Sequence, residues 1–215
     1  MSIKTIYLIR HAETDYNVNK IIQGRLIDSE LNKTGKKQAK ALFNKYNSVE
    51  FDKIYCTTLK RSKQTMSLFI KSGVSYEKIK DFDELCFGEK EGQPIYDIEG
   101  NFNLFELFEE WNNGNFYVKI DGGESPNEGL ERVQSGFESI ANRGENIIAI
   151  CLHQRILRII LCYLLQKSLS HMDEFPHNNT GVTILEFNSE TDEYSIIMQN
   201  NTDHLDFKGN GKSKK

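Results

Sequence analysis

The residues of this chain with the clearest chemical potential are two histidines, each placed where a short apolar run ends. The run at 6–9 is followed by Arg10 and His11, and the run at 147–152 is followed by His153. Short apolar runs of this length are typical of buried β-strands. In open α/β sheets the ligand crevice lies beyond the carboxyl ends of the strands. We therefore expect both imidazoles to face one pocket.

Arginines accompany the two histidines at the expected strand ends. A third strand candidate at 51–56 precedes a helix-like stretch that carries Arg61. A guanidinium presents a rigid fork of donors that matches phosphate oxygens and stays charged at any working pH. Helices that begin after Thr58 and after His153 would add unpaired backbone N–H groups aimed at the same anion. With Arg10, these groups predict a phosphate site.

His11 has the residue type and the position of a nucleophile. An imidazole attacks when one ring nitrogen is free and the other is held by a hydrogen bond. The arginines and His153 would stabilise the charge that builds on the transferred phosphoryl group. The leaving oxygen needs a proton donor, and the acidic segment at 81–92 supplies candidates. Five carboxylates there suit the role by their chemistry alone: Asp81, Asp83, Glu84, Glu89 and Glu91.

The order of these motifs resembles the histidine phosphatase superfamily, which includes cofactor-dependent phosphoglycerate mutases and related small phosphatases. The similarity runs through residues 8–17 (LIRHAETDYN), 23–24 (QG), 31–39, 61–65 (RSKQT), 84–92, 122–125 (GGES) and 153–158. It implies a three-layer α/β/α sandwich with a mostly parallel central sheet. It also implies His11 as the phosphohistidine nucleophile, Glu84 as the proton donor and His153 as the second active-site histidine.

The same resemblance implies which residues bind phosphate, and it exposes two departures. The implied phosphate-binding residues are Arg10, Asn17, Gln23, Gly24, Arg61 and the backbone of Gln154. Ala12 and Gln154 stand where the family usually has glycine. Ala12 fits if its φ is negative, because only a positive φ requires glycine. Gln154 could narrow the pocket or contact substrate.

The function we expect is a phosphomonoesterase that uses no cofactor and no metal. His11 attacks phosphorus, Glu84 protonates the departing oxygen, and the same carboxylate then activates water. The segment between Gly92 and Gly122 is shorter than in the mutases it resembles, and residues 200–205 resemble the ending of the small phosphatases. A mutase is therefore the second expectation. A weakly active module that binds a phosphorylated ligand is the third.

Bulk composition limits the class of protein. The chain has 215 residues, of which 38% are hydrophobic, and this suits one domain over 1–207. Within it we expect a cap or lid over the pocket at 94–121. The polar, basic segment at 208–215 should be a disordered tail. A net charge of -4 argues against general nucleic-acid binding. No apolar run is long enough to span a bilayer. Four isolated cysteines without paired spacing indicate reduced thiols, so we expect a cytoplasmic enzyme. The phosphatase interpretation implies a phosphorylated small molecule as its substrate. The oligomeric state stays open.

Local signals predict the elements that position the site. Asn32 is a suitable N-cap for a helix through Tyr46. Ser125, Pro126 and Glu128 form a capping-box signature for another helix. The stretch at 156–165 is apolar nearly all round, which is typical of a buried helix. Two strand-like segments at 182–187 and 194–198 predict a hairpin at the sheet edge.

Two polar groups fall outside these motifs. Residues 171–177 contain two histidines and two carboxylates, but they lack a recognisable ligand spacing, so we interpret them as a solvated loop. Glu124 is as suited to stabilising the dipole of the following helix as to touching substrate.

Overall fold

A six-stranded sheet forms the centre of the computed structural model, which describes residues 5–96, 103–141 and 143–205. The expected tail at 208–215 lies outside them. The strands are β1 (Thr5–Arg10), β2 (Lys53–Cys56), β3 (Tyr76–Lys78), β4 (Ile147–Leu152), β5 (Val182–Asn188) and β6 (Glu193–Asn201). Their order across the sheet is β3-β2-β4-β1-β5-β6. Strands β1 to β4 are parallel to one another, β5 is antiparallel to β1, and β6 is antiparallel to β5. The predicted mostly parallel sheet and edge hairpin are therefore confirmed.

The pairing of β1 with β4 brings the two histidines together. The two strands run parallel in one register, from Thr5 beside Ile147 to Arg10 beside Leu152. The ladder continues one step further, where the His11 N–H donates to the Leu152 carbonyl at 2.9 Å. His11 and His153 therefore leave the same edge of the sheet, as the two apolar runs predicted.

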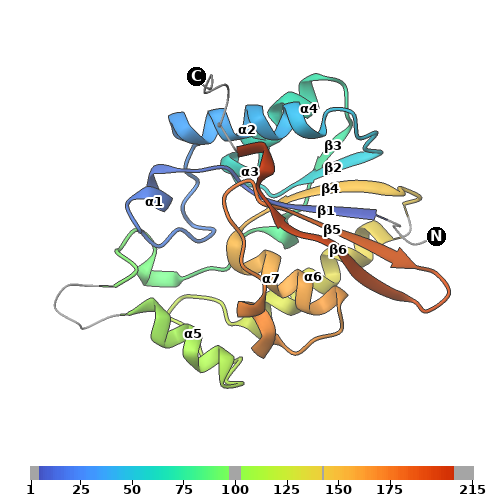
Figure 1. Ribbon diagram of the computed structural model, residues 1–215. Helices are drawn as coiled ribbons and strands as arrows, with labels where there is room; N and C mark the ends of the chain where they lie inside the picture. The colour runs from blue at the N-terminus through green and yellow to red at the C-terminus, as the bar shows by residue number, and fades with distance from the viewer. Residues whose placement is uncertain (1–4, 97–102, 142, 206–215) are drawn as a thin grey trace, which may run out of the picture.

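Helices cover both faces of the sheet (Figure 1). One face carries α2 (Lys33–Tyr46), α3 (Lys60–Thr65) and α4 (Ser67–Lys71), and the other carries α6 (Pro126–Ala141) and α7 (Gln154–Leu164). Apolar side chains of both helical layers pack against the sheet in separate clusters. This arrangement is the expected three-layer α/β/α sandwich.

Helix starts follow the capping signals in the sequence. Asn32 accepts from the Gly35 N–H at 2.8 Å and caps α2. At α6 the Ser125 N–H donates to the Glu128 carboxylate at 2.7 Å, and the Glu128 N–H donates back to the Ser125 hydroxyl at 3.3 Å. Each reciprocal bond satisfies a donor that the first helical turn leaves unpaired.

A smaller layer lies beyond α7 and covers the edge of the sheet where the histidines emerge (Figure 1). It contains α5 (Leu104–Asn112), whose Trp111 is buried and donates from its indole Nε1 to the Val118 carbonyl at 2.8 Å. The remaining short elements are α1 (Asp15–Val18) and the 3-10 turns η1 (Lys80–Phe82), η2 (Gly88–Lys90), η3 (Leu169–Glu174) and η4 (Asp203–Leu205).

The interpretation of residues 171–177 as a solvated loop is wrong only in part: His171, Asp173 and Glu174 are exposed, but the segment continues from the 3-10 turn η3 and contains buried residues. Met172 and His177 are buried, and η3 packs against α5 and α7. His177 holds Thr183 through Nε2 at 2.8 Å, and Asp173 binds two arginines of α7. Asp173 and His177 thus bind residues of other elements, which local composition does not reveal.

Candidate active site

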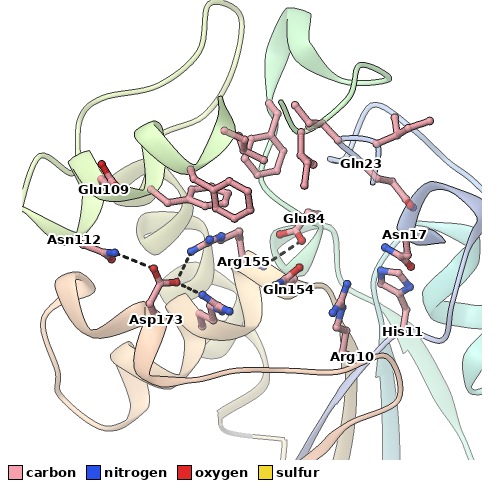
Figure 2. A pocket seen from close by; sticks show the side chains of 18 residues that line it. Arg10, His11, Asn17, Gln23, Glu84, Glu109, Asn112, Gln154, Arg155 and Asp173 are labelled. Carbon is pink, nitrogen blue, oxygen red and sulfur yellow. Dashed lines mark hydrogen bonds and ion pairs between the residues drawn. The ribbon is translucent and has the colours of Figure 1, made fainter. Parts of the chain in front are cut away.

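A cavity of about 580 Å³ is lined by residues that follow β1 and β4 at their carboxyl ends and by residues of α5. Six of the residues expected in the site line it: Arg10, His11, Asn17, Gln23, Glu84 and Gln154. Figure 2 shows His11, Asn17 and Arg10 on one side of this cavity and Glu84 and Gln154 facing them. Gly24, Arg61 and His153 are buried next to these residues but do not line the cavity.

His11 has the geometry of an oriented imidazole. Its Nδ1 lies 2.7 Å from the Ala12 carbonyl, and a carbonyl accepts only, so Nδ1 carries the proton. Nε2 then has a free lone pair and no hydrogen bond to any described residue. Burial, followed by the charges of Arg61 and Arg10, lowers the pKa of His11 well below its usual value. A neutral imidazole with one held nitrogen is the form that attacks phosphorus.

Ala12 occupies its position without strain. It is not among the described residues with a positive φ, so the glycine usual here in the family is not required. Its N–H donates to the Thr65 hydroxyl at 2.9 Å, while its carbonyl orients His11. Ala12 thus fixes the imidazole through its backbone, and its methyl group is buried.

His153 lies beside His11, with 5.1 Å between the ring centroids. Its Nδ1 accepts from Arg61 Nε at 3.1 Å, and its Nε2 is 2.8 Å from the Thr57 hydroxyl. Burial is the main cause that lowers the pKa of His153, so this imidazole is neutral too. We expected His153 to donate directly to phosphoryl oxygens. In this geometry both ring nitrogens are engaged by protein.

Arg61 is fully buried and bound to the loop before it. Its Nη1 donates to the Ile27 carbonyl at 2.7 Å and its Nη2 to the Gly24 carbonyl at 3.1 Å. With the Gln23 amide oriented to satisfy both of its ends, the Gln23 oxygen also accepts from Arg61. Burial lowers the pKa of Arg61 to about 10, which leaves it charged at neutral pH. It contributes positive charge close to both histidines.

Arg10 retains a donor for a ligand. Its Nη1 donates to the His177 carbonyl at 2.7 Å, but its buried Nε has no acceptor among the described residues. A buried donor without a partner costs free energy that a bound anion would recover. Burial also lowers the pKa of Arg10 to about 10. These observations fit an anion site at Arg10.

Glu84 caps the helix that follows His153. Its carboxylate accepts the N–H groups of Arg155 at 3.2 Å and Ile156 at 3.0 Å, and that of Leu85 at 3.0 Å. We expected the N-terminus of α7 to point its donors at phosphate, but two of them bind Glu84. The second helix start differs in the same way, because the Thr58 N–H donates to Asp83 at 2.7 Å.

The five candidate carboxylates differ in whether they line the cavity. Glu84 lines it, and the other four do not. Asp83 is occupied by Thr58, and Glu91 accepts from the Phe87 and Leu26 N–H groups, both at 3.0 Å. Glu91 also explains Gly24, because a Cβ at that position would lie 2.1 Å from the Glu91 carboxylate.

Asn17 has a structural role as well as a place in the cavity. Its side-chain oxygen accepts from the Thr14 N–H at 3.1 Å and completes the capping box of α1. Asn179 donates to this oxygen at 3.2 Å and to the His11 carbonyl at 2.9 Å. Asn179 is not predicted by the sequence, since no motif or periodicity marks this loop residue.

The far end of the cavity contains further residues that the sequence did not assign to the site. Arg155, Arg158, Asp173 and Phe108 line it. Arg155 and Arg158 follow His153 at helical spacing, which was a usable signal. Asp173 and Phe108 come from segments distant in sequence, and only tertiary packing places them here.

The Glu124 side chain neither caps α6 nor lines the cavity. Arg132 donates two hydrogen bonds to its carboxylate, of 2.7 Å and 2.8 Å, and Arg25 donates a third at 3.1 Å.

Among the described residues, no group of three or more histidine, cysteine, aspartate and glutamate side chains could hold a metal ion. No helix of the described chain combines the length and apolar character needed to cross a membrane.

Comparisons with known proteins agree with this geometry. Residues 6–201 match the family model of the histidine phosphatase superfamily, branch 1. The chain is 30% identical to phosphoserine phosphatase 1 of Hydrogenobacter thermophilus, covering 93% of each. It is 29% identical to a broad-specificity phosphatase of Saccharomyces cerevisiae, over 95% of this chain and 88% of that protein. The crystal structure of the alpha-ribazole phosphatase from Shigella flexneri superimposes with a TM-score of 0.79 at 23% identity, over 92% and 96% of the chains. The chain therefore belongs to branch 1 of the histidine phosphatase superfamily.

Proposed function

We propose that this protein is a phosphomonoesterase of the histidine acid type that acts through a phosphohistidine on His11. The observation that carries the proposal is the His11 ring, whose Nδ1 is held by the Ala12 carbonyl and whose Nε2 is free at the cavity wall. Arg10 lies next to it with an unpartnered donor, and Glu84 lies across the cavity. Named phosphatases among the relatives of the chain support the same reaction class.

The first chemical step transfers the phosphoryl group to the protein. The lone pair of His11 Nε2 attacks phosphorus, and the bond from phosphorus to the ester oxygen breaks. Glu84 in its acid form gives its proton to the departing oxygen, which leaves as an alcohol. Arg10 and Arg61 stabilise the negative charge on the three remaining oxygens.

The second step releases phosphate. The Glu84 carboxylate takes a proton from a water molecule as the water oxygen attacks phosphorus. The bond between phosphorus and His11 Nε2 breaks, inorganic phosphate leaves, and Glu84 is again protonated. Both steps use only groups of the chain, so we propose that the reaction needs no metal and no cofactor.

The proposal includes the substrate class and the location. The cavity volume suits a phosphorylated small molecule rather than a folded protein surface. All four cysteines are free and buried, which fits a reducing compartment such as the cytoplasm. The net charge of -4 argues against a nucleic-acid partner.

Replacement of the nucleophile tests the proposal. We expect His11→Ala to lower kcat for p-nitrophenyl phosphate by about 10⁴-fold or more, because the covalent route is lost. Wild type quenched during turnover of a ³²P-labelled ester should carry an acid-labile, base-stable label, and His11→Ala should carry none. His171→Ala, which removes an exposed histidine outside the cavity, is the matched control. Hydrolysis by His11→Ala at near wild-type rate would reject the covalent mechanism.

A further inference from the structure

Two arginines share one carboxylate at the end of the cavity opposite His11. Arg155 Nη1 lies 3.0 Å from Asp173 Oδ1, and Arg158 Nη1 binds the same oxygen. The second oxygen of Asp173 accepts from the Asn112 amide at 2.8 Å. Figure 2 shows this cluster on the cavity wall, with Arg155 between Asp173 and Glu84.

The cluster of Arg155, Arg158 and Asp173 contains two positive charges and one negative charge. Arg155 and Arg158 are only 7% and 8% exposed, and Asp173 supplies one negative charge for two. The Glu84 carboxylate adds a negative charge that attracts both arginines, but among the described residues no hydrogen bond joins it to either guanidinium group. Burial, and then the charge of Arg158, lowers the pKa of Arg155 to about 10. A bound anion would compensate this buried charge.

Arg158 has an unused donor of its own. Its Nε is buried and has no acceptor among the described residues, although the side chain lines the cavity. The cost of such a donor is removed when a ligand oxygen accepts from it. Arg10, on the phosphate side of the cavity, has an unpartnered Nε of the same kind. The cavity thus offers two separate cationic donors.

Packing holds Arg155 in one orientation. Its guanidinium carbon lies 3.4 Å from the centroid of the Phe108 ring, so the planar group stacks on α5. A stacked guanidinium loses little conformational entropy when it binds an anion. Apolar side chains also line the cavity: Ile22, Phe87, Leu104 and Phe108.

We propose that the substrate carries a second anionic group, a carboxylate or a second phosphate, which Arg155 and Arg158 bind while the scissile phosphate lies on His11. The proposal rests on the proposed function and deepens it, because it names what the rest of the substrate must contain. A phosphomonoester with an apolar or cationic far end would leave the Arg158 donor unpartnered, and a neutral acceptor would not compensate the charge of the guanidinium.

Matched substrate pairs test the proposal in the wild-type protein. O-phosphoserine and O-phosphoethanolamine differ only by a carboxylate, and fructose 1,6-bisphosphate and fructose 6-phosphate differ only by a phosphate. We expect kcat/KM to be about tenfold or more higher for the doubly anionic member of at least one pair. The pair that responds identifies the second anion. Equal kcat/KM within both pairs would overturn the proposal.

Variants assign the preference to the arginines. In Arg158→Gln and Arg155→Gln we expect the kcat/KM ratio within the responding pair to fall by about tenfold. Arg143→Gln removes an exposed arginine that pairs with Glu77 away from the cavity, and it should preserve the ratio. Thermal melting of each variant reports folding. If the arginines only anchor α5, both members of a pair will lose activity equally, which would also overturn the proposal. Labelling of His11 by p-nitrophenyl phosphate checks the proposed function separately.

Discussion

Asp83 and Glu84 are adjacent in sequence, but their carboxylates bind the starts of two different helical segments. Asp83 accepts from the Thr58 N–H at 2.7 Å and from the Thr58 hydroxyl at 2.6 Å, just before α3. Glu84 accepts from the first turn of α7, which follows His153. One dipeptide therefore ties the helix that carries Arg61 to the helix that begins at the second histidine. The candidate acid Glu84 is therefore held in place by the same dipeptide that joins these two helices.

Replacing Glu84 by glutamine should slow esters with poor leaving groups much more than p-nitrophenyl phosphate. Only a poor leaving group needs a proton in the transition state, and general acid catalysis contributes about 10²- to 10⁴-fold. We also expect a stability loss of about 1 kcal/mol, because the new amide N–H₂ would face backbone donors of α7. Rates on alkyl and nitrophenyl phosphates and a melting curve measure the two effects.

The exposed Glu89, outside the cavity, provides the matched control for this substitution. Glu89→Gln should change neither the rates nor the dependence on leaving group. If Glu84→Gln lowers both substrate types equally, the acid is another of the five carboxylates.

The activity of the free enzyme should persist to mildly acidic pH. The neutral form of His11 attacks, and burial with Arg61 and Arg10 lowers its pKa well below 6.5. Protonation therefore removes the nucleophile only on the acid side of that value. We expect kcat/KM for p-nitrophenyl phosphate to have no decline attributable to His11 between pH 8 and pH 6, as a pH-rate profile would show. An acidic limb centred at or above pH ~6.5 would contradict the lowered pKa of His11 if the limb persists in the His171→Ala control.

Chelators should leave the activity unchanged. Arg10 and Arg61 supply the positive charge that a cation supplies in metal-dependent phosphatases. The measurement is phosphate release before and after prolonged dialysis against EDTA. Vanadate, which imitates the pentacoordinate phosphorus, should inhibit instead. A loss of activity in EDTA that zinc or magnesium restores would refute the metal-free proposal.

Phosphate release should exceed phosphoglycerate interconversion by a wide margin. A mutase must keep water from its phosphohistidine until a second hydroxyl arrives, whereas a phosphatase admits water. The short 94–121 segment favours entry of water. Release of phosphate and interconversion of 2- and 3-phosphoglycerate can be followed in one assay by NMR. Dominant interconversion, stimulated by a bisphosphorylated primer, would favour the mutase.

The sequence by itself determined the sheet edge and its chemistry. The apolar runs before His11 and His153 became β1 and β4, because strands in the middle of a sheet with helices on both faces bury most of their side chains. The capping residues Asn32 and Ser125 set the starts of α2 and α6, because their hydrogen bonds are local. Strand β3 was not predicted, since its three residues are largely exposed and lack a periodic pattern.

Only the tertiary structure decided how the donors of the site are shared. His153 is held between Arg61 and Thr57, and the amides of α7 bind Glu84, because groups distant in sequence compete for the same hydrogen bonds. Local chemistry left five carboxylates equivalent, and in the structure Glu84 is the one of the five that lines the cavity. Asp173 joined Arg155 through the packing of η3 against α5 and α7. Residue types and spacing therefore specify which groups meet, while long-range packing specifies which of their atoms remain free to bind substrate.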